Sequence, residues 1–303
     1  MYSINLHIII LFTFSIVNVF LYMVQTTTST KLYDPPSSDV EKFRSLVKEA
    51  KNIIAITGAG ISGVPTYSSA WGLWRNFEGS DLDNDYTFDN IPFLVWEFTH
   101  YRREVILKSG PNAAQKALAD YENYMREEGK GRNMTVITLN TDGLHSLAGS
   151  RHVIEMSGSL FKTKCVKCGE IRENWQQPIS PSLAGKGSPS AHLDYVQADE
   201  EAVPHCSKPG CDGRLRPYVL FTGEDFPKQV VDSAEDALRL ADLCLVVGTS
   251  SSVRPVSEFG PTLAGRGVPV AEFNVVNTDA TMYFPFQFKG NCSITLPQVL
   301  NTD

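Results

Sequence analysis

Four of the six cysteines in this 303-residue chain form two close pairs, Cys165 with Cys168 and Cys206 with Cys211. Short turns with nearby glycine let two such pairs bring four thiolates to one tetrahedral metal ion. The stretch between the pairs is rich in proline, glycine, serine and charge and has too few apolar residues for its own core, so a metal would supply folding energy. We predict one structural Zn²⁺ per chain, with a closed sulfur shell and no part in catalysis. Two disulfides are the alternative, if the domain is extracellular.

A second group of residues suggests a nucleotide site at the ends of three apolar runs. The run IIAIT ends at Gly58-Ala59-Gly60, where glycine lets the backbone approach a phosphate, although glycine after a strand is also common in simple turns. The run LCLVV contains Cys244, expected to be a buried thiol, and ends at Gly248 and the hydroxyls of residues 249–251. The run VPVAEF ends at Asn274, which can bind a ribose hydroxyl. Three such ends on one sheet edge make a dinucleotide, with NAD foremost, the expected ligand.

The elements that must hold these residues alternate between strand and helix patterns. The runs MTVITLNTD, LCLVVGTSS and VPVAEFN are continuously apolar, which is typical of parallel strands covered on both faces. Helical patterns lie between them, and the first, in residues 39–51, places Val40, Phe43 and Val47 on one face behind Asp39 as N-cap. The sequence therefore predicts an α/β fold, a Rossmann-like doubly wound parallel sheet with a small zinc-binding insert.

The first 38 residues form a separate region of hydrophobic segment and linker. Residues 4–24 are almost wholly apolar and long enough to cross a bilayer, so a membrane anchor, a signal peptide and an artefact of gene prediction are the competing interpretations. The domain proper is expected over residues 39–303, with the zinc-binding insert at about residues 162–216. The net charge of -7 and the lack of a long basic run argue against nucleic acid as a partner.

Five motifs occur in the order found in the sirtuins, which are NAD-dependent protein-lysine deacylases. They are the Gly-Ala-Gly-x-Ser loop, Asn-x-Asp at residues 140–142, GSLF at 158–161, the paired cysteines around an insert, and GTSS at 248–251. The chain resembles this family from about Asp39 to Leu300, and HYRREV, GSLFKTKC and RGVPVAEFN are most similar to the mitochondrial branch that removes malonyl, succinyl and glutaryl groups. The resemblance implies NAD as cofactor, acylated lysine of proteins as partner and a mitochondrial location. Membrane attachment through residues 4–24 is the alternative location.

The resemblance also implies roles for single residues. In the family, the acyl group passes to the ribose of NAD as nicotinamide leaves, and a histidine base activates a ribose hydroxyl. By position, Asn140, Asp142 and Ser157 are the candidate catalytic residues, and Thr99 and Arg102 are the candidate substrate contacts. The candidate cofactor contacts are Gly58, Ala59, Gly60, Ser62, Asn140, Asp142, Gly248, Thr249, Ser250, Asn274 and Cys292.

Ser157 stands where the family has its base histidine, because the chain has EMSGSLF in place of a His-Gly pair before SLF. A serine hydroxyl has no pKa near neutrality and cannot act as the base unaided. His152 lies five residues upstream, and we expect that it does not substitute. Loss of one general base predicts a rate lower by on the order of a hundredfold to ten-thousandfold.

Further departures from the family gather round the same reactive end. Three residues are missing between Ser62 and Gly63. In the branch that removes acidic acyl groups, a tyrosine and an arginine hold the substrate carboxylate, and here only Arg102 remains of that pair. The substitutions, in chain order, are Tyr67-Ser68-Ser69 for Phe-Arg-Gly, Thr99 for tyrosine, Leu139 for glutamine and Thr222 for an aromatic residue.

Two functional hypotheses follow. The first is an NAD-dependent protein-lysine deacylase of the desuccinylase, demalonylase or deglutarylase type, with a weakened second step. The second is a non-catalytic module of the same fold that binds NAD, ADP-ribose or acyl-lysine, and the altered reactive end favours this one for turnover. A plain α/β domain whose glycines are only turns is disfavoured by the ordered set of motifs.

Overall fold

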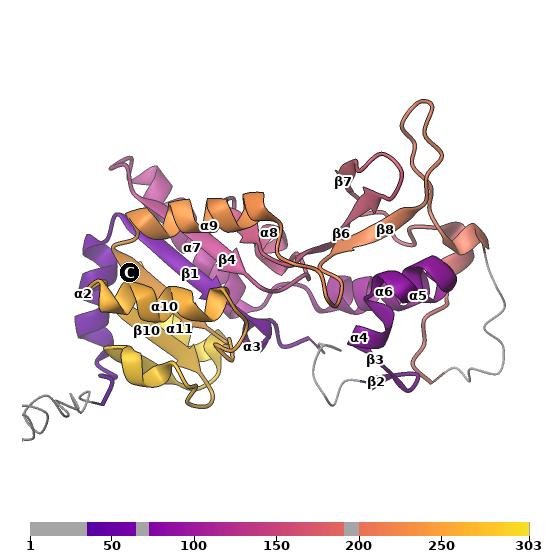
Figure 1. Ribbon diagram of the computed structural model, residues 1–303. Helices are drawn as coiled ribbons and strands as arrows, with labels where there is room; N and C mark the ends of the chain where they lie inside the picture. The colour runs from indigo at the N-terminus through magenta and orange to yellow at the C-terminus, as the bar shows by residue number, and fades with distance from the viewer. Residues whose placement is uncertain (1–34, 65–72, 191–199, 303) are drawn as a thin grey trace, which may run out of the picture. The chain divides into compact units, whose positions relative to one another are not determined.

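The computed structural model describes residues 35–64, 73–190 and 200–302. The fold lies in a compact unit that begins at Pro36. Its main sheet has six parallel strands in the order β11-β10-β9-β1-β4-β5 (Figure 1). In chain order these strands are β1 (Asn52–Thr57), β4 (Asn133–Thr138), β5 (Val153–Glu155), β9 (Leu243–Val247), β10 (Val270–Asn274) and β11 (Phe286–Lys289).

Helices cover both faces of this sheet, which explains why its central strands are mostly apolar rather than alternating. One face packs on α2 (Val40–Glu49), α7 (Ala113–Glu127) and α11 (Cys292–Leu300), and the other on α9 (Lys228–Leu240) and α10 (Val256–Gly265). Along β1, Ile53 and Ala55 belong to the first core, whereas Ile54 and Ile56 belong to the second. Successive side chains of a strand point to opposite faces, so a strand buried on both sides alternates between two cores. The predicted Rossmann-like, doubly wound α/β fold is confirmed.

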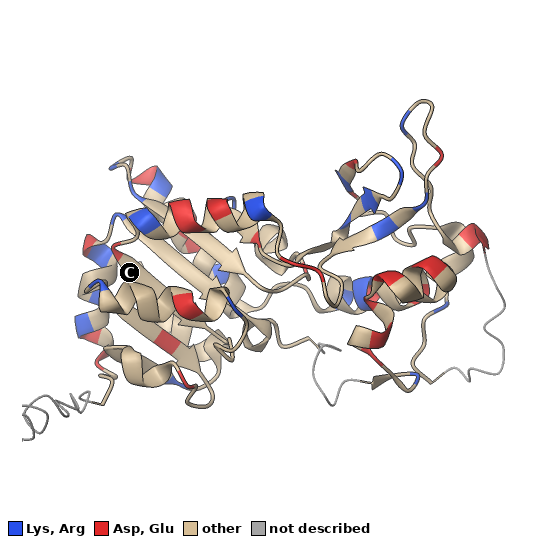
Figure 2. Cartoon of the chain, viewed as in Figure 1, with Lys and Arg blue, Asp and Glu red and all other residues tan. Residues whose placement is uncertain are grey.

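The outer helices follow ordinary capping and amphipathic rules. The side chain of Asp39 accepts a hydrogen bond from Lys42 N at 3.0 Å, as predicted for the N-cap of α2, and Phe43 faces the core. On the outer side of α9 the basic residues Lys228 and Arg239 lie near the two ends with acidic residues between them (Figure 2), while Ala234 and Leu238 face the sheet. The burial of one apolar stripe per helix therefore holds the two layers on the sheet.

A second, antiparallel sheet in the order β7-β6-β8 carries the paired cysteines. Its strands are β6 (Gly158–Cys165), β7 (Ile171–Glu173) and β8 (Leu215–Val219), so the sheet extends beyond residues 162–216 at both ends. Helices α5 (Asp85–Asn90) and α6 (Pro92–Ser109) pack with it around a core that includes Trp96 and Phe221. Trp96 Nε1 donates to Leu215 O at 2.9 Å. Residues far upstream of the cysteines therefore complete the core that the insert lacks.

Short elements make the remaining connections, and α3 and α4 border the candidate site described below. They are β2 (Leu73–Trp74), β3 (Phe77–Glu78), α3 (Ala59–Ser62), α4 (Gly79–Leu82), α8 (Leu144–Ala148), and the 3-10 turns η1 (Pro181–Leu183), η3 (Glu200–Ala202) and η4 (Thr281–Tyr283).

Two predictions fall on residues outside the described ranges. These are the apolar segment at residues 4–24 and the substituted tripeptide Tyr67-Ser68-Ser69. Within the described ranges, no helix combines the length and apolar character that a membrane crossing requires.

Candidate functional site

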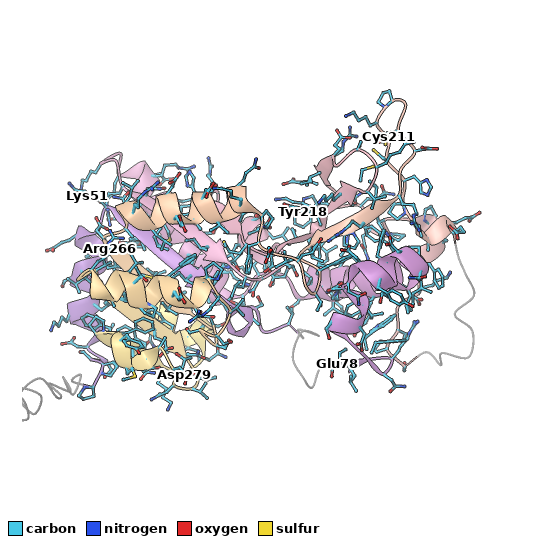
Figure 3. The ribbon with its side chains drawn as sticks, in the orientation of Figure 1. Lys51, Glu78, Cys211, Tyr218, Arg266 and Asp279 are labelled. Atoms are coloured by element: carbon cyan, nitrogen blue, oxygen red, sulfur yellow. The ribbon has the colours of Figure 1, made fainter. Side chains whose placement is uncertain are left out.

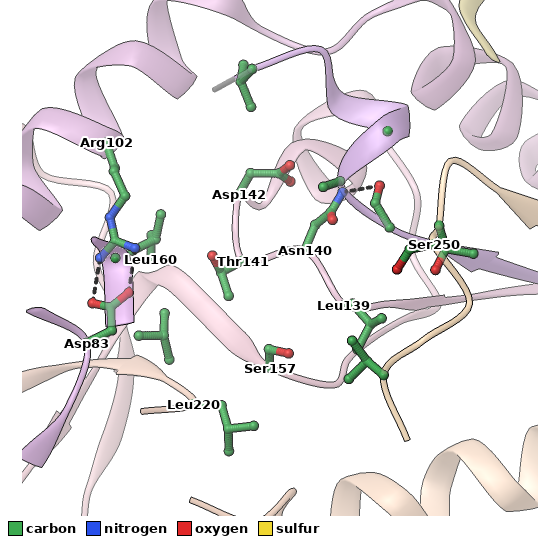
Figure 4. Close-up of a pocket in the computed structure, with 18 of the residues that line it drawn as sticks. Asp83, Arg102, Leu139, Asn140, Thr141, Asp142, Ser157, Leu160, Leu220 and Ser250 are labelled. Carbon is green, nitrogen blue, oxygen red and sulfur yellow. Dashed lines mark hydrogen bonds and ion pairs between the residues drawn. The ribbon is translucent and has the colours of Figure 1, made fainter. Parts of the chain in front are cut away.

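The carboxyl ends of four neighbouring strands border one cavity of about 720 Å³ (Figure 4). In sheet order, β9, β1, β4 and β5 lead into Gly248, Gly58, Asn140 and Ser157. The chain builds the sheet outward from β1 through β4 on one side and returns through β9 on the other, and folds of this kind bind ligands at such a switch point. The predicted site residues that line the cavity are Gly58, Ala59, Gly60, Arg102, Asn140, Asp142, Ser157, Gly248, Thr249 and Ser250.

Glycine is required where the loops after β1 and β9 touch. A Cβ added at Gly60 would lie 2.8 Å from Gly248 O, and one added at Gly248 would overlap Ile61 N. Gly248 also has a φ of +58°, where an L side chain is strained. Gly60 N donates to Gly248 O at 2.7 Å. The glycines expected to bring the backbone close to a phosphate therefore also lock the two loops together.

Ser62, Asn140 and Asp142 form a hydrogen-bonded network beside the cavity. Asn140 Nδ2 donates to Ser62 Oγ at 2.9 Å and to Gly58 O at 3.0 Å, and Ser62 Oγ donates to Asp142 Oδ2 at 2.5 Å. Burial raises the pKa of Asp142, although the hydrogen bonds from Ser62 and from Leu144 N oppose this shift. The network joins the loop after β1 to the loop after β4. It brings the three predicted residues together, with Ser62 buried next to the two that line the cavity.

Ser157 lines this cavity and also a second cavity of about 390 Å³. Its carbonyl accepts a hydrogen bond from Leu220 N at 2.9 Å, which ties the loop after β5 to the end of β8. The second cavity is bordered by Tyr218, labelled in Figure 3, and by Glu224. A side chain at position 157 therefore stands where both spaces meet.

No histidine is among the described residues that line either cavity. His152 directly precedes β5, and its side chain is 57% exposed. Its Nδ1 atom lies 2.7 Å from Glu122 Oε1 on α7. His145 is buried on α8 with Nε2 at 2.9 Å from Thr57 Oγ1, and burial lowers its pKa to about 4. The placement of His152 agrees with the expectation that it does not replace the missing base.

Arg102 lines the large cavity from α6, but its guanidinium is already paired. It donates to Asp83 Oδ2 at 2.6 Å and to Asp83 Oδ1 at 2.8 Å, a bidentate contact that Figure 4 shows. The sequence analysis missed Asp83, because it lies 19 residues from Arg102 and only the packing of α4 on α6 brings the two together. Thr99 is fully buried and does not line the cavity, and its hydroxyl has no hydrogen-bond partner among the described residues.

Besides Ser62, two of the candidate cofactor contacts do not line the cavity. Asn274 Nδ2 donates to Thr249 O at 2.9 Å, so its amide supports the loop after β9. Cys292 is buried at the start of α11, where burial raises its pKa and its Sγ donates to Phe273 O at 3.4 Å. Asn274 therefore supports the backbone that carries Thr249, and Cys292 contacts the carbonyl of Phe273 in β10.

The four paired cysteines converge in the insert, near the labelled Cys211 in Figure 3. All four Sγ atoms lie within 4.8 Å of one another, with 3.7 Å between those of Cys165 and Cys211 and 3.9 Å between those of Cys168 and Cys206. A disulfide needs about 2.0 Å, so these separations exclude the disulfide alternative. Tetrahedral zinc with Zn–S bonds of about 2.3 Å places its sulfurs about 3.8 Å apart, so the cluster fits this ion. A hydrogen bond from Cys168 N lowers the pKa of Cys165 to about 7, which favours the thiolate that binds metal.

Comparison with known proteins identifies the family. Residues 58–255 match the profile of the Sir2 family. The chain belongs to this family. Among similar sirtuins, the NAD-dependent protein deacylase sirtuin-5, mitochondrial, of Canis lupus familiaris is 47% identical over 268 residues, which are 88% of this chain and 86% of the relative. The NAD-dependent protein deacylase of Daphnia pulex is 46% identical over 88% of this chain and 97% of its own length.

Solved sirtuin structures share the fold. One described as a Sir2 homolog–NAD complex is 29% identical, with a TM-score of 0.73 over 90% of this chain and 97% of that chain. Another, a mutant Sir2 homologue with ADP ribose, is 30% identical with a TM-score of 0.70. The Rossmann-like architecture of this chain is therefore that of the sirtuins.

The cavity of this sirtuin has the size and polarity that NAD requires. Its volume lies within the range of roughly 300–1,000 Å³ that is usual for small-molecule sites. Ser250 and Ser252 Oγ lie 2.7 Å apart, and Ser250 lies on the opposite side of the view in Figure 4 from Arg102 and Asp83. Hydroxyls such as these can hydrogen-bond phosphate or ribose oxygens, and Asn140 Oδ1 can accept a hydrogen bond from a ribose hydroxyl, since the Nδ2 group already donates to Gly58 O and Ser62 Oγ. Ser252, which the sequence analysis missed, directly follows the GTSS motif.

Proposed function

We propose that this sirtuin is an NAD-dependent protein-lysine deacylase of weakened activity. In this proposal NAD occupies the large cavity and the acyl-lysine enters through the second cavity. When bound, NAD supplies the ribose carbon that accepts the acyl oxygen while nicotinamide leaves. The observation that carries the proposal is that the two cavities meet at Ser157, in a chain 47% identical to named deacylases.

The residues of the large cavity bind and orient NAD. Asn140 and Asp142 present an amide and a carboxyl group to the cavity, and Ser62 restrains both side chains. Because these groups are already fixed, little conformational entropy is lost when they bind a ribose or the nicotinamide end. The serines after β9 offer hydroxyls to the other end of the ligand.

Ser157 weakens the later proton transfer. A serine hydroxyl does not accept a proton near neutral pH, and no described residue of either cavity is a histidine. Asp83, a carboxylate of the large cavity, is held by Arg102, and the carboxyl group of Asp142 receives hydrogen bonds from Ser62 and Leu144. Deacylation is therefore expected to be slower than with a histidine at position 157 by on the order of a hundredfold to ten-thousandfold.

The serine at position 157 also favours a second candidate function, which is a non-catalytic sensor of NAD, ADP-ribose or acyl-lysine. The features that would bind a nucleotide are present, whereas the group that would act as base is replaced. Such a module would bind the same ligands without converting them.

Mass spectrometry separates the two functions. Peptides with one acetyl-, butyryl- or succinyl-lysine are incubated with NAD and the zinc-loaded protein. Slow deacylation that depends on NAD supports the enzyme, and NAD binding in calorimetry with no converted peptide supports the sensor. Absence of NAD binding by the folded protein contradicts both.

We also propose a mitochondrial location, since the most similar sirtuins described above include one named as mitochondrial. Microscopy of the tagged chain with and without residues 1–30 tests this. The tag should co-localise with a mitochondrial marker only when those residues are present, and an unchanged distribution after their removal contradicts a targeting role.

A further inference from the structure

The charges inside the large cavity bear on which acyl group it takes. Its charged lining residues are Asp83, Arg102 and Asp142, so Arg102 is the one cation on the wall formed by the described residues. An acyl group that ends in a carboxylate needs an available cation or several hydrogen-bond donors when water is removed. Acceptance of such an acyl group therefore depends on whether the guanidinium of Arg102 can bind a further carboxylate.

Arg102 already has a carboxylate partner, because both terminal nitrogens of its guanidinium donate hydrogen bonds to Asp83. The two contacts, at 2.6 Å and 2.8 Å, match the bidentate geometry of a carboxylate bound to arginine. Nε of Arg102 is buried without a hydrogen-bond partner among the described residues, and the guanidinium lies 3.9 Å from the centre of the Phe98 ring. Asp83 uses two of the five N–H donors of Arg102, so a second carboxylate would have to share this cation with a negative charge that is already in contact with it.

Asp83 is held in this position by its own backbone. Asp83 N donates to Gly79 O at 2.8 Å, and Thr222 N donates to Asp83 O at 2.7 Å. The side chains of Asp83 and Arg102 are only 17% and 13% exposed. Moving Asp83 aside would break the ion pair and leave its charge partly desolvated, which is costly.

The surroundings of the pair are mostly aliphatic, and the uncharged polar side chains near it in the lining are those of Ser80, Thr141 and Thr222. The aliphatic residues of the cavity are Val64, Val105, Ile106, Leu160, Val219 and Leu220, with Leu139 and Val253 nearer the sheet edge. Thr99 offers no hydrogen bond to a ligand, since its hydroxyl is buried outside the lining. A carboxylate here would meet the negative charge of Asp83 and aliphatic side chains.

We infer that this site takes an uncharged, aliphatic acyl group on lysine and rejects acyl groups that end in a carboxylate. This inference rests on the proposed function for the presence of acyl-lysine in the site. It differs from the malonyl, succinyl and glutaryl preference that the sequence resemblance implies. The difference arises because the Asp83–Arg102 pair turns a cationic subsite into a neutral one.

The test compares two peptides that differ only at the end of the acyl chain. Butyryl-lysine and succinyl-lysine have the same four-carbon length, with a methyl group in one and a carboxylate in the other. Binding to the zinc-loaded full chain is measured by calorimetry in low salt, so that slow turnover does not obscure the result. We expect the butyryl peptide to bind about tenfold or more tightly than the succinyl peptide, because like charges repel in a partly desolvated site.

Variants of Asp83 identify the cause. Asp83→Asn keeps the shape and removes the negative charge, so succinyl-lysine binding should rise about tenfold while butyryl-lysine binding changes little. Asp83→Ala should have the same effect and provides a second variant if the first is poorly folded. Asp89→Asn, an exposed residue of α5 outside the cavity, is the matched control and should leave both affinities unchanged.

Two results would overturn the inference. One is a wild-type protein that binds succinyl-lysine as tightly as butyryl-lysine or more tightly, or that binds neither. The other is an Asp83→Asn variant whose preference equals that of the wild type. A preference for butyryl-lysine in a protein that does not bind NAD would support the inference and remove the NAD-dependent function alone.

Discussion

The nucleotide edge of the sheet and the acyl end of the cavity are built in different ways. At the nucleotide edge, Gly60 and Gly248 touch backbone to backbone, and Ser62 hydrogen-bonds Asn140 and Asp142 at once. At the acyl end, single side chains such as Ser157 and Asp83 decide the chemistry. We expect a change at the nucleotide edge to disturb the fold and a change at the acyl end to affect mainly ligand binding and turnover.

This difference explains why the altered residues gather at one end. Side chains that touch a ligand but support few neighbours can be replaced at small cost in stability. Residues that hold two loops together cannot be replaced at small cost, because a larger side chain there forces the backbone to move. The predictions below test this contrast, beginning with the largest effect.

Removal of zinc should loosen the lobe that carries the acyl end and spare the parallel sheet. Structural zinc sites contribute an apparent binding free energy on the order of 10 kcal/mol. Treatment with a chelator should therefore speed hydrogen exchange in residues 158–219 far more than in residues 243–274, as measured by mass spectrometry. Re-addition of zinc should restore protection. Equal acceleration in both regions would contradict a separate, metal-dependent lobe.

Ser157→His should raise NAD-dependent deacylation of a butyryl-lysine peptide by about a hundredfold to ten-thousandfold, the usual contribution of a general base. The midpoint of thermal unfolding should change little, because position 157 stands at the junction of two cavities. The measurement is the initial rate at saturating NAD. An unchanged rate in a folded variant would place the limit in the shortened loop after Ser62.

Gly248→Ala should lower the free energy of unfolding by about 4 kcal/mol, from backbone strain of roughly 1–2 kcal/mol and overpacking of roughly 1–3 kcal/mol. Gly63→Ala is the control, since Gly63 has a similar φ of +65° but no atom of the described residues within 4 Å of an added Cβ. Gly63→Ala should lower the free energy of unfolding only by the contribution from backbone strain. Urea unfolding measures both, and equal losses would mean that the contact between the loops contributes nothing.

Acid should destabilise the nucleotide edge through His145. The folded protein holds its pKa at about 4 against 6.5 for the free side chain, so the unfolded chain binds the proton first as the pH falls. The stabilising effect is complete above about pH 6.5 and is lost as the pH drops toward 4, a change of about 3 kcal/mol. Urea unfolding at several pH values should show this slope in the wild type and a flatter one in His145→Gln. Parallel profiles would exclude His145 as the cause.

The sequence predicts the parallel sheet and the metal site well, because both depend on local patterns. The continuous apolar runs become strands buried on two faces, and the spacing of Cys165, Cys168, Cys206 and Cys211 brings four sulfurs together. The ends of β1, β4 and β9 meet in one cavity, as parallel strands must.

What the sequence could not predict depends on packing between distant segments. Nothing near Asp83 indicates that α4 and α6 place it against Arg102, and the conclusion about acyl groups changes with that contact. In the same way, α5 and α6 lie upstream of the cysteines but complete the core of their sheet. Asn274 and Cys292 were expected to touch the cofactor, and the structure places them beside the loop that carries Thr249.

Strand β6 connects the substituted position 157 to the predicted zinc site. It starts at Gly158, next to the substituted serine, and ends at Cys165, a predicted zinc ligand. The strand has no room for a side chain at Gly158, since a Cβ there would overlap the carbonyl of Tyr218 on the neighbouring strand. The predicted zinc ligand Cys165 and the position next to Ser157 therefore lie at opposite ends of one strand, so zinc binding should restrain where Ser157 stands.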